Sequence, residues 1–283
     1  MGLRLSSQED LWKVLEQSGE YCQKLAGAAL DFICEETITE IQYNINTEAI
    51  SEQKKFWYKM VRRTKTGTYV AITWGNQPLW DPWRTEKNQY VCDYQLIKKG
   101  DLIKEQRIIL KENGRKITDQ KKLLEEKHFS MLTPLFAAVR LFALDRQLLF
   151  NYRILEEVKV QGKEAYVIEA VPKFKNVGEV EYSIIWVDKK SFQILEIEIE
   201  GIPIEGYEDI LKESTLLNQK PELRTTNHYQ IEKKGVLFPS RSRIRAEYPP
   251  QRSMAKTIPR LKIDMTYDKF KFFTVETYSK IIK

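Results

Sequence analysis

The sequence predicts an α+β fold that is mostly β: a strongly curved antiparallel sheet, or half-open β-barrel, of about 10–11 strands with helices covering its concave face. Residues 152–202 supply the first observation, because they read as four short strands in succession, joined by tight breaks. Within 195–200, apolar residues alternate with glutamates, a pattern that buries one strand face and leaves the other in water. Breaks this short join antiparallel neighbours, since a parallel pair needs a long crossover.

Helical patterns, the second observation, occur in two places only, near the start of the chain and in its middle. Runs of strands with segregated helices are typical of an antiparallel sheet that carries its helices on one face. A twisted sheet of this size has to curl or close. A curved sheet wrapped around helices is therefore the economical solution.

The first predicted element is a helix over about 8–25. Ser6 with Glu9, or Ser7 with Asp10, has the spacing of a capping box. Apolar residues then recur at helical spacing, which predicts that one face of this helix packs on the sheet.

Four further strands are expected before the second helical region, at 56–63, 68–74, 90–98 and 102–111. Asn113-Gly114 follows the last of them, and Asn-Gly is one of the strongest short-range signals for a hairpin turn. The segment 74–83 contains three tryptophans. We interpret it as a plug that packs onto the rim of the sheet, with the rim of a ligand mouth as the alternative.

The second helical region, 119–150, is predicted to contain two helices. Its first part, 119–128, is charged, and Thr133-Pro134 then opens a short helix, because proline is favoured at the first helical position. One stripe of this short helix is apolar and consists of Leu135, Phe136, Val139 and Phe142. We interpret the stripe as core, and a movable lid over the sheet is the alternative.

Strands return near the end of the chain, at 227–232, 236–247 and 260–267. In the second of these strands arginines alternate with other residues, so their side chains are expected to point away from the core. They are Arg241, Arg243 and Arg245. No change of composition and no Pro/Gly/Ser-rich linker divides residues 1–283, so we expect a single domain.

The composition is that of an ordinary soluble globular protein, with 42% hydrophobic and 30% charged residues in 283. A net charge of +6 is spread along the chain and is too weak to indicate nucleic-acid binding. The sequence contains no segment apolar enough to span a membrane. No apolar signal sequence follows Met1, so we expect either a cytosolic protein or a trimmed exported one.

The motifs of common enzyme classes are missing from the sequence, which has no GxSxG, GxxxxGK[ST], HExxH or GxGxxG. The two histidines, His128 and His228, have no neighbouring serine, cysteine or aspartate that suggests a catalytic triad. There is no CxxC, so a zinc site is not indicated. We therefore expect no catalytic residues, no cofactor and no metal.

Several pieces of the chain resemble one known superfamily. They are Tyr21-Cys22, Phe32-Ile33-Cys34-Glu35, Tyr90-Val91-Cys92-Asp93-Tyr94, Trp186-Val187-Asp188 with the following Ile194-Leu195-Glu196-Ile197, and the closing YDKFKFFTV at 267–275. With these pieces in this order, the chain resembles the LolA-like lipoprotein-carrier superfamily, and in particular a bacterial envelope branch of it without an assigned function.

The resemblance implies a half-open barrel with helices inside the concave face, an exported, periplasmic location, and an acyl chain held in an apolar cavity. A lipid or acyl-chain-like ligand is then the expected partner. Two alternatives stay open: an envelope interaction or sensor domain with a solid core and a protein partner, and a phosphate- or nucleic-acid-binding module that uses the arginines. We rank the last of these lowest, because a charged outer strand face gives the same pattern without any partner.

A carrier of this kind needs an apolar lining on the concave side of the sheet. The residues expected there are Val70, Ile72, Trp74, Tyr94, Leu96, Ile184, Trp186 and Ile197, facing Leu135, Phe136, Val139 and Phe142 from the short helix.

The three cysteines bear on the location of the protein. One disulfide with one buried thiol would fit an exported protein, and three thiols would fit a cytosolic one. Folding the chain after 27 back over the first helix could bring Cys22 and Cys34 within the ~4.4–6.8 Å between Cα atoms that a disulfide needs. We expect Cys22 bonded to Cys34, and Cys92 free.

Overall fold

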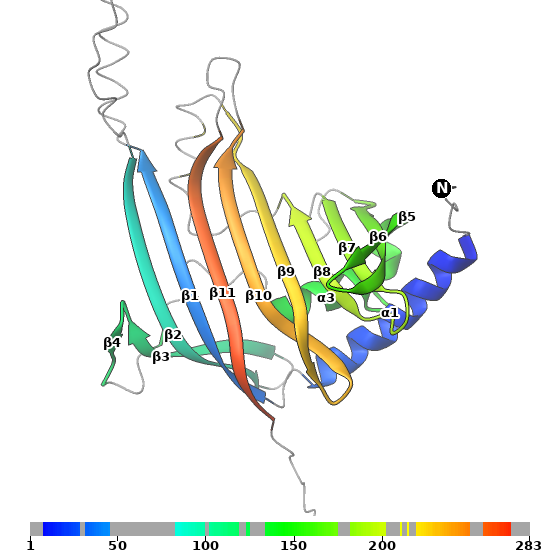
Figure 1. The fold of residues 1–283 in the computed structure, drawn as a ribbon, viewed down its shortest axis with the longest axis horizontal. Coiled ribbons are helices and arrows are strands. Elements are labelled where there is room, and N and C mark those ends of the chain that lie inside the picture. Colours follow the sequence, from blue (N-terminus) through cyan, green and yellow to red (C-terminus); the bar gives the residue numbers. More distant parts are fainter. Residues whose placement is uncertain are drawn as a thin grey trace, which may run out of the picture.

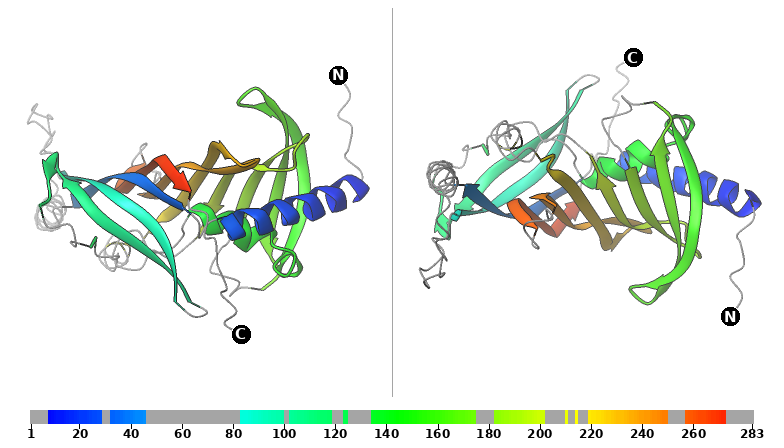
Figure 2. Two further views of the ribbon diagram at one scale, coloured as in Figure 1. Left: turned by 90° about the horizontal axis from the view of Figure 1, so that it is seen from below. Right: turned by 90° about the horizontal axis from the view of Figure 1, so that it is seen from above.

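The computed structural model describes residues 8–28, 32–45, 83–99, 102–118, 123–124, 134–174, 182–201, 210, 214, 219–249 and 257–272. Within these ranges eleven strands form one antiparallel sheet in the order β4-β3-β2-β1-β11-β10-β9-β8-β7-β6-β5. The sheet is strongly curved, and its end strands do not meet (Figures 1 and 2). The predicted fold class is confirmed.

The described helices are α1 (Gln8–Ala28), α3 (Pro134–Phe142) and the short 3-10 helix η2 (Gln147–Leu149). The strands of the first half of the chain are β1 (Phe32–Ile45), β2 (Trp83–Lys99), β3 (Leu102–Glu112) and β4 (Arg115–Lys116). The strands of the second half are β5 (Phe150–Val160), β6 (Lys163–Pro172), β7 (Tyr182–Asp188), β8 (Ile194–Glu200), β9 (Glu222–Lys233), β10 (Val236–Tyr248) and β11 (Ile258–Phe272).

The predicted hairpin turns form because their residues tolerate left-handed backbone. Asn113 and Gly114, between β3 and β4, have φ of 48° and 78°, and Lys234 and Gly235, between β9 and β10, have 50° and 76°. Two successive positive φ values are the signature of a type I′ turn, whose twist matches that of the flanking strands. These turns set the register of both hairpins.

The central meander, β5–β8, has the predicted alternation. On β8, Leu195, Ile197 and Ile199 are buried, and the glutamates between them are half-buried on the other face. One side of the sheet, which we call the inward face, therefore carries the core. The other side is the outward face.

Helices α1 and α3 pack against each other and chiefly on β5, β8 and β10, inside the curve of the sheet (Figure 2). Side chains of α1 anchor it to backbone carbonyls far away in the sequence: the Tyr21 hydroxyl donates to Leu237 O at 2.7 Å and Ser18 Oγ donates to Phe192 O at 3.0 Å. We call β5–β10 the helix-covered half.

One prediction for the middle of the chain is contradicted at the two of its residues that the structure describes. The described part of the expected charged helix at 119–128 is Leu123 and Leu124, and it lies beside β3. Leu123 forms a β-bridge with Ile108, and the Leu124 N–H donates to Arg107 O at 3.0 Å. Pairing with the sheet has overridden a helical preference there, which is common because propensity is a weak prior. The predicted strands at 56–63 and 68–74 lie outside the described residues.

Candidate functional site

The inward face brings together several of the residues predicted to line a cavity. Tyr94 and Leu96 on β2, Ile197 on β8 and Phe142 on α3 are all buried in one continuous apolar cluster. The apolar stripe of α3 is directed at the same cluster, and its half-buried members are Phe136 and Val139. These residues therefore belong to one core cluster, to which the sheet and α3 both contribute.

Two of the predicted residues lie on the wrong side of the sheet. Ile185 on β7 is paired with Ile197, whereas Ile184 is paired with Glu198 and Trp186 with Glu196. Successive strand side chains point to opposite faces, so Ile184 and Trp186 belong to the outward face, and the prediction that they share a surface with Ile197 is wrong. Strand β7 is apolar on both faces, which hides the period of two.

The remaining predicted residues cannot be placed. Val70, Ile72 and Trp74 lie outside the described residues, and so does the side chain of Leu135. The tryptophan-rich segment at 74–83 is described only at Trp83, the first residue of β2.

The predicted Cys22–Cys34 disulfide is wrong, because Cys22, Cys34 and Cys92 are all free and buried. Cys22 faces α3, where its thiol lies 3.4 Å from Ala138 O. Cys34 lies in the sheet instead, paired with Tyr94. Burial raises the pKa of all three thiols, that of Cys92 to about 12, so they are protonated and unreactive in the folded protein.

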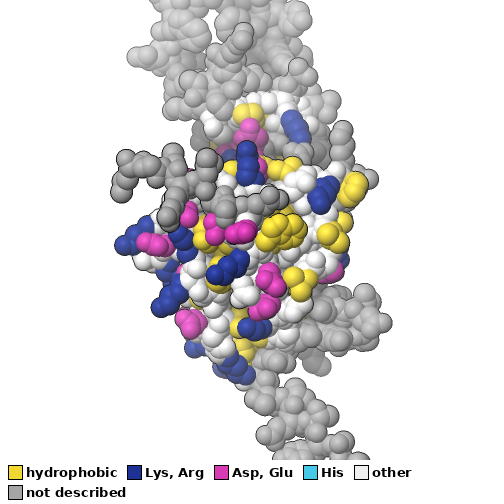
Figure 3. Space-filling view, turned by 90° about the vertical axis from the view of Figure 1, so that its right-hand side faces the viewer, with side chains coloured by type: hydrophobic (Ala, Val, Ile, Leu, Met, Phe, Trp, Pro, Cys, Tyr) yellow, Lys and Arg dark blue, Asp and Glu magenta, His cyan; other side chains and the backbone are white. Residues whose placement is uncertain are grey.

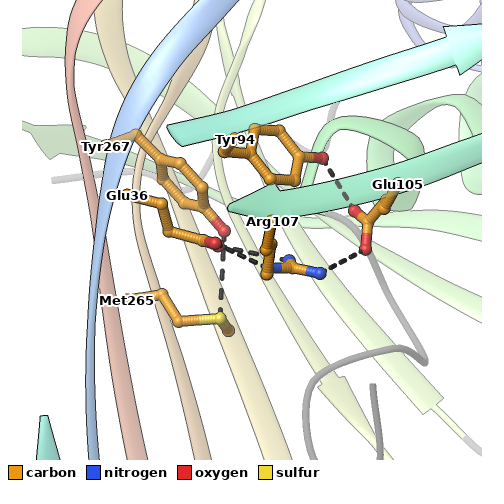
Figure 4. Close-up of polar contacts among 6 residues, drawn as sticks. All are labelled: Glu36, Tyr94, Glu105, Arg107, Met265 and Tyr267. Atoms are coloured by element: carbon orange, nitrogen blue, oxygen red, sulfur yellow. Dashed lines mark hydrogen bonds and ion pairs between the residues drawn. The ribbon is translucent and has the colours of Figure 1, made fainter. Parts of the chain in front are cut away.

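Sequence reasoning missed a buried charge cluster on the inward face of β1–β3 (Figure 4). Arg107 on β3 holds Glu36 on β1 through two nitrogens, with Nε to Oε2 at 2.6 Å and Nη2 to Oε1 at 3.2 Å. Its third nitrogen reaches Oε2 of Glu105 at 2.7 Å. Glu36 is 0% and Arg107 5% exposed, so this is an ion network removed from water.

Two tyrosines complete the cluster. The Tyr94 hydroxyl donates to Glu105 Oε1 at 2.7 Å, and the Arg107 guanidinium lies 5.0 Å from the centre of the Tyr94 ring, within reach of a cation–π interaction. Tyr267 on β11 lies opposite Glu36 and packs against Tyr94 with ring centres 5.9 Å apart. We call β1–β4 together with β11 the ionic half.

Burial and charge pull the pKa values of this cluster in opposite directions. Burial raises the pKa of Glu105, and Arg107 only partly offsets it. Burial alone would lower the pKa of Arg107, but Glu36 and Glu105 outweigh it and raise that pKa. Burial, and then Glu36, raises the pKa of Tyr267. Arg107 is therefore a fixed cation, and Glu105 binds a proton more readily than an ordinary glutamate does.

The sequence of β1 contains a pattern from which a buried ion pair could have been predicted. The inward positions of this strand are Phe32, Cys34, Glu36, Ile38 and Glu40, all buried. An acid among apolar residues at strand period requires a buried partner, and Arg107 supplies one. Which strand carries that partner depends on the pairing of β1 with β2 and of β2 with β3.

The arginines of β10 lie on the outward face, as predicted, with Ala246 buried and Ile244 half-buried on the other side. Arg241 forms an ion pair with Asp264 on β11, and Nε of Arg243 lies 3.7 Å from the same carboxylate. A depression of about 270 Å³ opens beside them and is lined by Thr37, Thr39, Ile41, Arg241, Lys262, Asp264 and Thr266.

On β8 and β9 the outward face pairs basic with acidic side chains. Arg224 on β9 lies 3.3 Å from Glu198 and 2.6 Å from Glu200, both on β8. The end of the molecule that faces the viewer in Figure 3 likewise mixes both signs of charge with scattered hydrophobic side chains. Among the described residues, this mixture of charges does not favour a nucleic acid as the partner.

The described ranges contain neither a metal-binding cluster nor a membrane-spanning helix. No three His, Cys, Asp or Glu side chains gather there closely enough to hold a metal ion. Neither described α-helix is long and apolar enough to cross a membrane.

No protein-family model matches this chain, and no curated protein matches it. Solved structures do. A Vibrio parahaemolyticus domain, described as an outer membrane lipoprotein-sorting protein, is 11% identical with a TM-score of 0.38, over 93% of this chain and 95% of that one. A LolA superfamily protein from Nitrosomonas europaea is 12% identical with a TM-score of 0.38, over 93% and 94%.

A DUF1329 family protein from Desulfovibrio piger is 10% identical with a TM-score of 0.35, over 93% of this chain and 95% of that one. The Nitrosomonas europaea protein bears the name of the superfamily that the sequence resembles. At this level of similarity they do not identify a ligand or a partner, which must follow from this chain's own residues.

Proposed function

We propose that this chain is a non-enzymatic, exported binding protein that holds a lipid-like or other apolar ligand between its curved sheet and its helices, in lipoprotein or lipid carriage. One observation carries the proposal. Buried apolar side chains of one cluster come from β5–β11 and from β1 and β2, yet in the part of the chain that the structure describes α1 and α3 chiefly contact β5, β8 and β10. A curved sheet of this size cannot be filled by its own side chains, so helices and a ligand share the remaining space.

On this proposal the ligand lies against the inward face and the apolar stripe of α3. Tyr94, Leu96, Ile197 and Phe142 form the floor, and Phe136 and Val139 contact the ligand from the helix. The free space would be roughly 300–1,000 Å³, the usual size of a small-molecule site. Val70, Ile72, Trp74 and Leu135 belong to the same proposal. The periplasm is the expected location, in line with the superfamily resemblance.

Binding of a fluorescent fatty-acyl probe tests the proposal. Wild-type protein should take up the probe with an increase in fluorescence. Phe136→Asp should abolish uptake, because an unpaired carboxylate in an apolar site is costly to desolvate. Phe136→Ala should keep it, since that change only enlarges the space.

The matched control is Leu148→Asp, which introduces the same charge at an apolar residue of η2 that is 75% exposed. It should leave probe uptake unchanged. Wild-type protein that takes up no probe, and carries no lipid in native mass spectrometry, would contradict the carrier proposal.

A specific observation favours a second candidate, an envelope interaction or sensor domain with a solid core. The helices are fastened by several long-range hydrogen bonds, including Tyr21 to Leu237 O at 2.7 Å and Gln147 Nε2 to Leu15 O at 2.8 Å. A firmly fastened helix pair suits a structural core better than a lid. In that case the same probe assay gives no signal, and a protein partner should be sought.

A further inference from the structure

Three strands of the helix-covered half bury polar side chains on their inward face. Asn227 on β9, Ser242 on β10 and Ser183 on β7 are each 0% exposed. Within the part of the chain that the structure describes, the two amide atoms of Asn227 and both serine hydroxyls have no hydrogen-bond partner. Native proteins pair the large majority of their buried polar atoms. Four unpaired atoms on one face are therefore groups that the polar part of a ligand can satisfy.

Register places two of these residues side by side. Asn227 lies directly opposite Ser242, in adjacent antiparallel strands, where the Cβ atoms of a cross-strand pair are ~4.5–5.5 Å apart. The neighbour of Asn227 along the chain, His228, points to the outward face, with Nδ1 3.1 Å from Glu196 Oε2. Amide and hydroxyl thus project from the same face, close enough to contact one small group.

The surroundings of this pair are apolar. The same row across the sheet continues to Ile197 and Ile185 on one side, and to Met265 and Ile38 on the other. These four side chains are at most 1% exposed. A charged ligand group would lose its hydration here without meeting a cation among them, which is unfavourable. The chemistry favours an uncharged polar group on an apolar chain.

We propose that Asn227 and Ser242 bind the head of an acyl chain that carries an amide, an inference that rests on the proposed function above. Asn227 Nδ2 and Ser242 Oγ can both donate to the carbonyl oxygen, and Asn227 Oδ1 can accept the N–H. An ester carbonyl accepts from the two donors but offers no N–H to Asn227 Oδ1. A hydrocarbon pairs with none of these three atoms. Affinity should therefore decrease in the order amide, ester, hydrocarbon, and a free carboxylate should bind more weakly than the amide.

Displacement of the fluorescent acyl probe tests this order. Four competitors of equal chain length are compared: a primary fatty amide, a methyl ester, a free fatty acid and an alkane. Wild-type protein should prefer the amide to the alkane by at least roughly tenfold, the effect of one or two net hydrogen bonds. Asn227→Leu, of similar volume, should bind the probe but lose this preference.

Two further variants sharpen the result. Ser242→Ala removes one hydroxyl with little change of size and should reduce the preference only in part. Thr226→Val changes the outward face of the same strand and should leave the order of the competitors unchanged. The melting temperature gives an independent measurement: unliganded Asn227→Leu should melt above wild type, because a buried unpaired amide has been replaced by an apolar group.

Failure takes two separable forms. If wild-type protein binds the probe but ranks all four competitors equally, or if Asn227→Leu keeps the wild-type order, the amide site is wrong and the carrier function stands. If wild-type protein binds neither the probe nor any competitor, both proposals are wrong.

Discussion

The helix-covered half and the ionic half of the sheet bury their inward faces by different chemistry. Under α1 and α3 the core is mostly aliphatic and aromatic, with the neutral polar residues Asn227, Ser242 and Ser183 among it. Tyrosines there donate to neutral carbonyls, as Tyr21 of α1 does to Leu237 O and Tyr248 of β10 to Ile210 O, both at 2.7 Å. In the ionic half, Arg107 lies between two carboxylates. The stability of the helix-covered half therefore depends on close packing, whereas that of the ionic half depends on every buried charge keeping its partner.

The largest expected effect is in the ionic half. Arg107→Met should lower the free energy of unfolding by about 3–5 kcal/mol, because Glu36 is left buried and charged without its partner. Urea unfolding measures this directly. The double variant Glu36→Gln/Arg107→Met should recover much of the loss, since no buried charge is then unpaired. A double variant as unstable as the single one would show that packing, and not charge, dominates this half too.

A pair of tyrosine variants compares the two halves by the same chemical change. Tyr94→Phe removes a hydrogen bond to the Glu105 carboxylate and should cost about 1.5–3 kcal/mol, whereas Tyr21→Phe removes one to a neutral carbonyl and should cost about 0.5–1.5 kcal/mol. Both are read from thermal or urea unfolding. Equal losses would remove the distinction between the halves at these positions.

The pH dependence of stability should reveal Glu105. Its pKa is raised by burial from an ordinary value of 4.5, so the folded protein binds this proton more tightly than the unfolded chain does. The contribution of Glu105 to stability is therefore largest below pH 4.5 and declines as pH rises towards its folded pKa. The difference in unfolding free energy between wild type and Glu105→Gln should change across that window. A difference independent of pH would contradict the assignment.

The last prediction concerns the redox state of the three cysteines and involves no change in stability. Cys22 lies on α1, whereas Cys34 and Cys92 lie on β1 and β2 of the ionic half, and each should be a free thiol. Thiol counting on denatured, non-reduced protein should return three, and the folded protein should react slowly, because burial raises the pKa of each thiol. A count of one would restore the disulfide and contradict the structure.

Much of the sheet could be predicted from the sequence, because its information is local. Asn113-Gly114 predicts its own turn, and the alternation of apolar residues with glutamates on β8 defines both faces of that strand. The apolar stripe predicts the packing of α3 only in part: Phe142 is buried and Phe136 and Val139 are half-buried, but Ala137, Ala138 and Leu141, outside the stripe, are buried too.

The rest depends on which strands are neighbours, and no short segment contains that information. Glu36 and Arg107 meet only because β1 pairs with β2 and β2 with β3. Strand β7 is apolar on both faces, so its period could not show that Ile184 and Trp186 point outward. The distance between Cys22 and Cys34 depended on how α1 lies across the sheet, which Ser18 and Tyr21 determine through distant carbonyls.

The position of β1 in the sheet has a consequence for folding during synthesis. This strand is flanked by β2 and by β11, and Lys269 on β11 reaches back to Glu35 across 234 residues. The meander β5–β8 can form from near neighbours alone, whereas the β1–β11 junction has to wait for the last strand to be synthesised. Until then one edge of β1 is unpaired. Such an edge can pair with a strand of another chain, so the nascent protein is prone to aggregation unless a chaperone covers it.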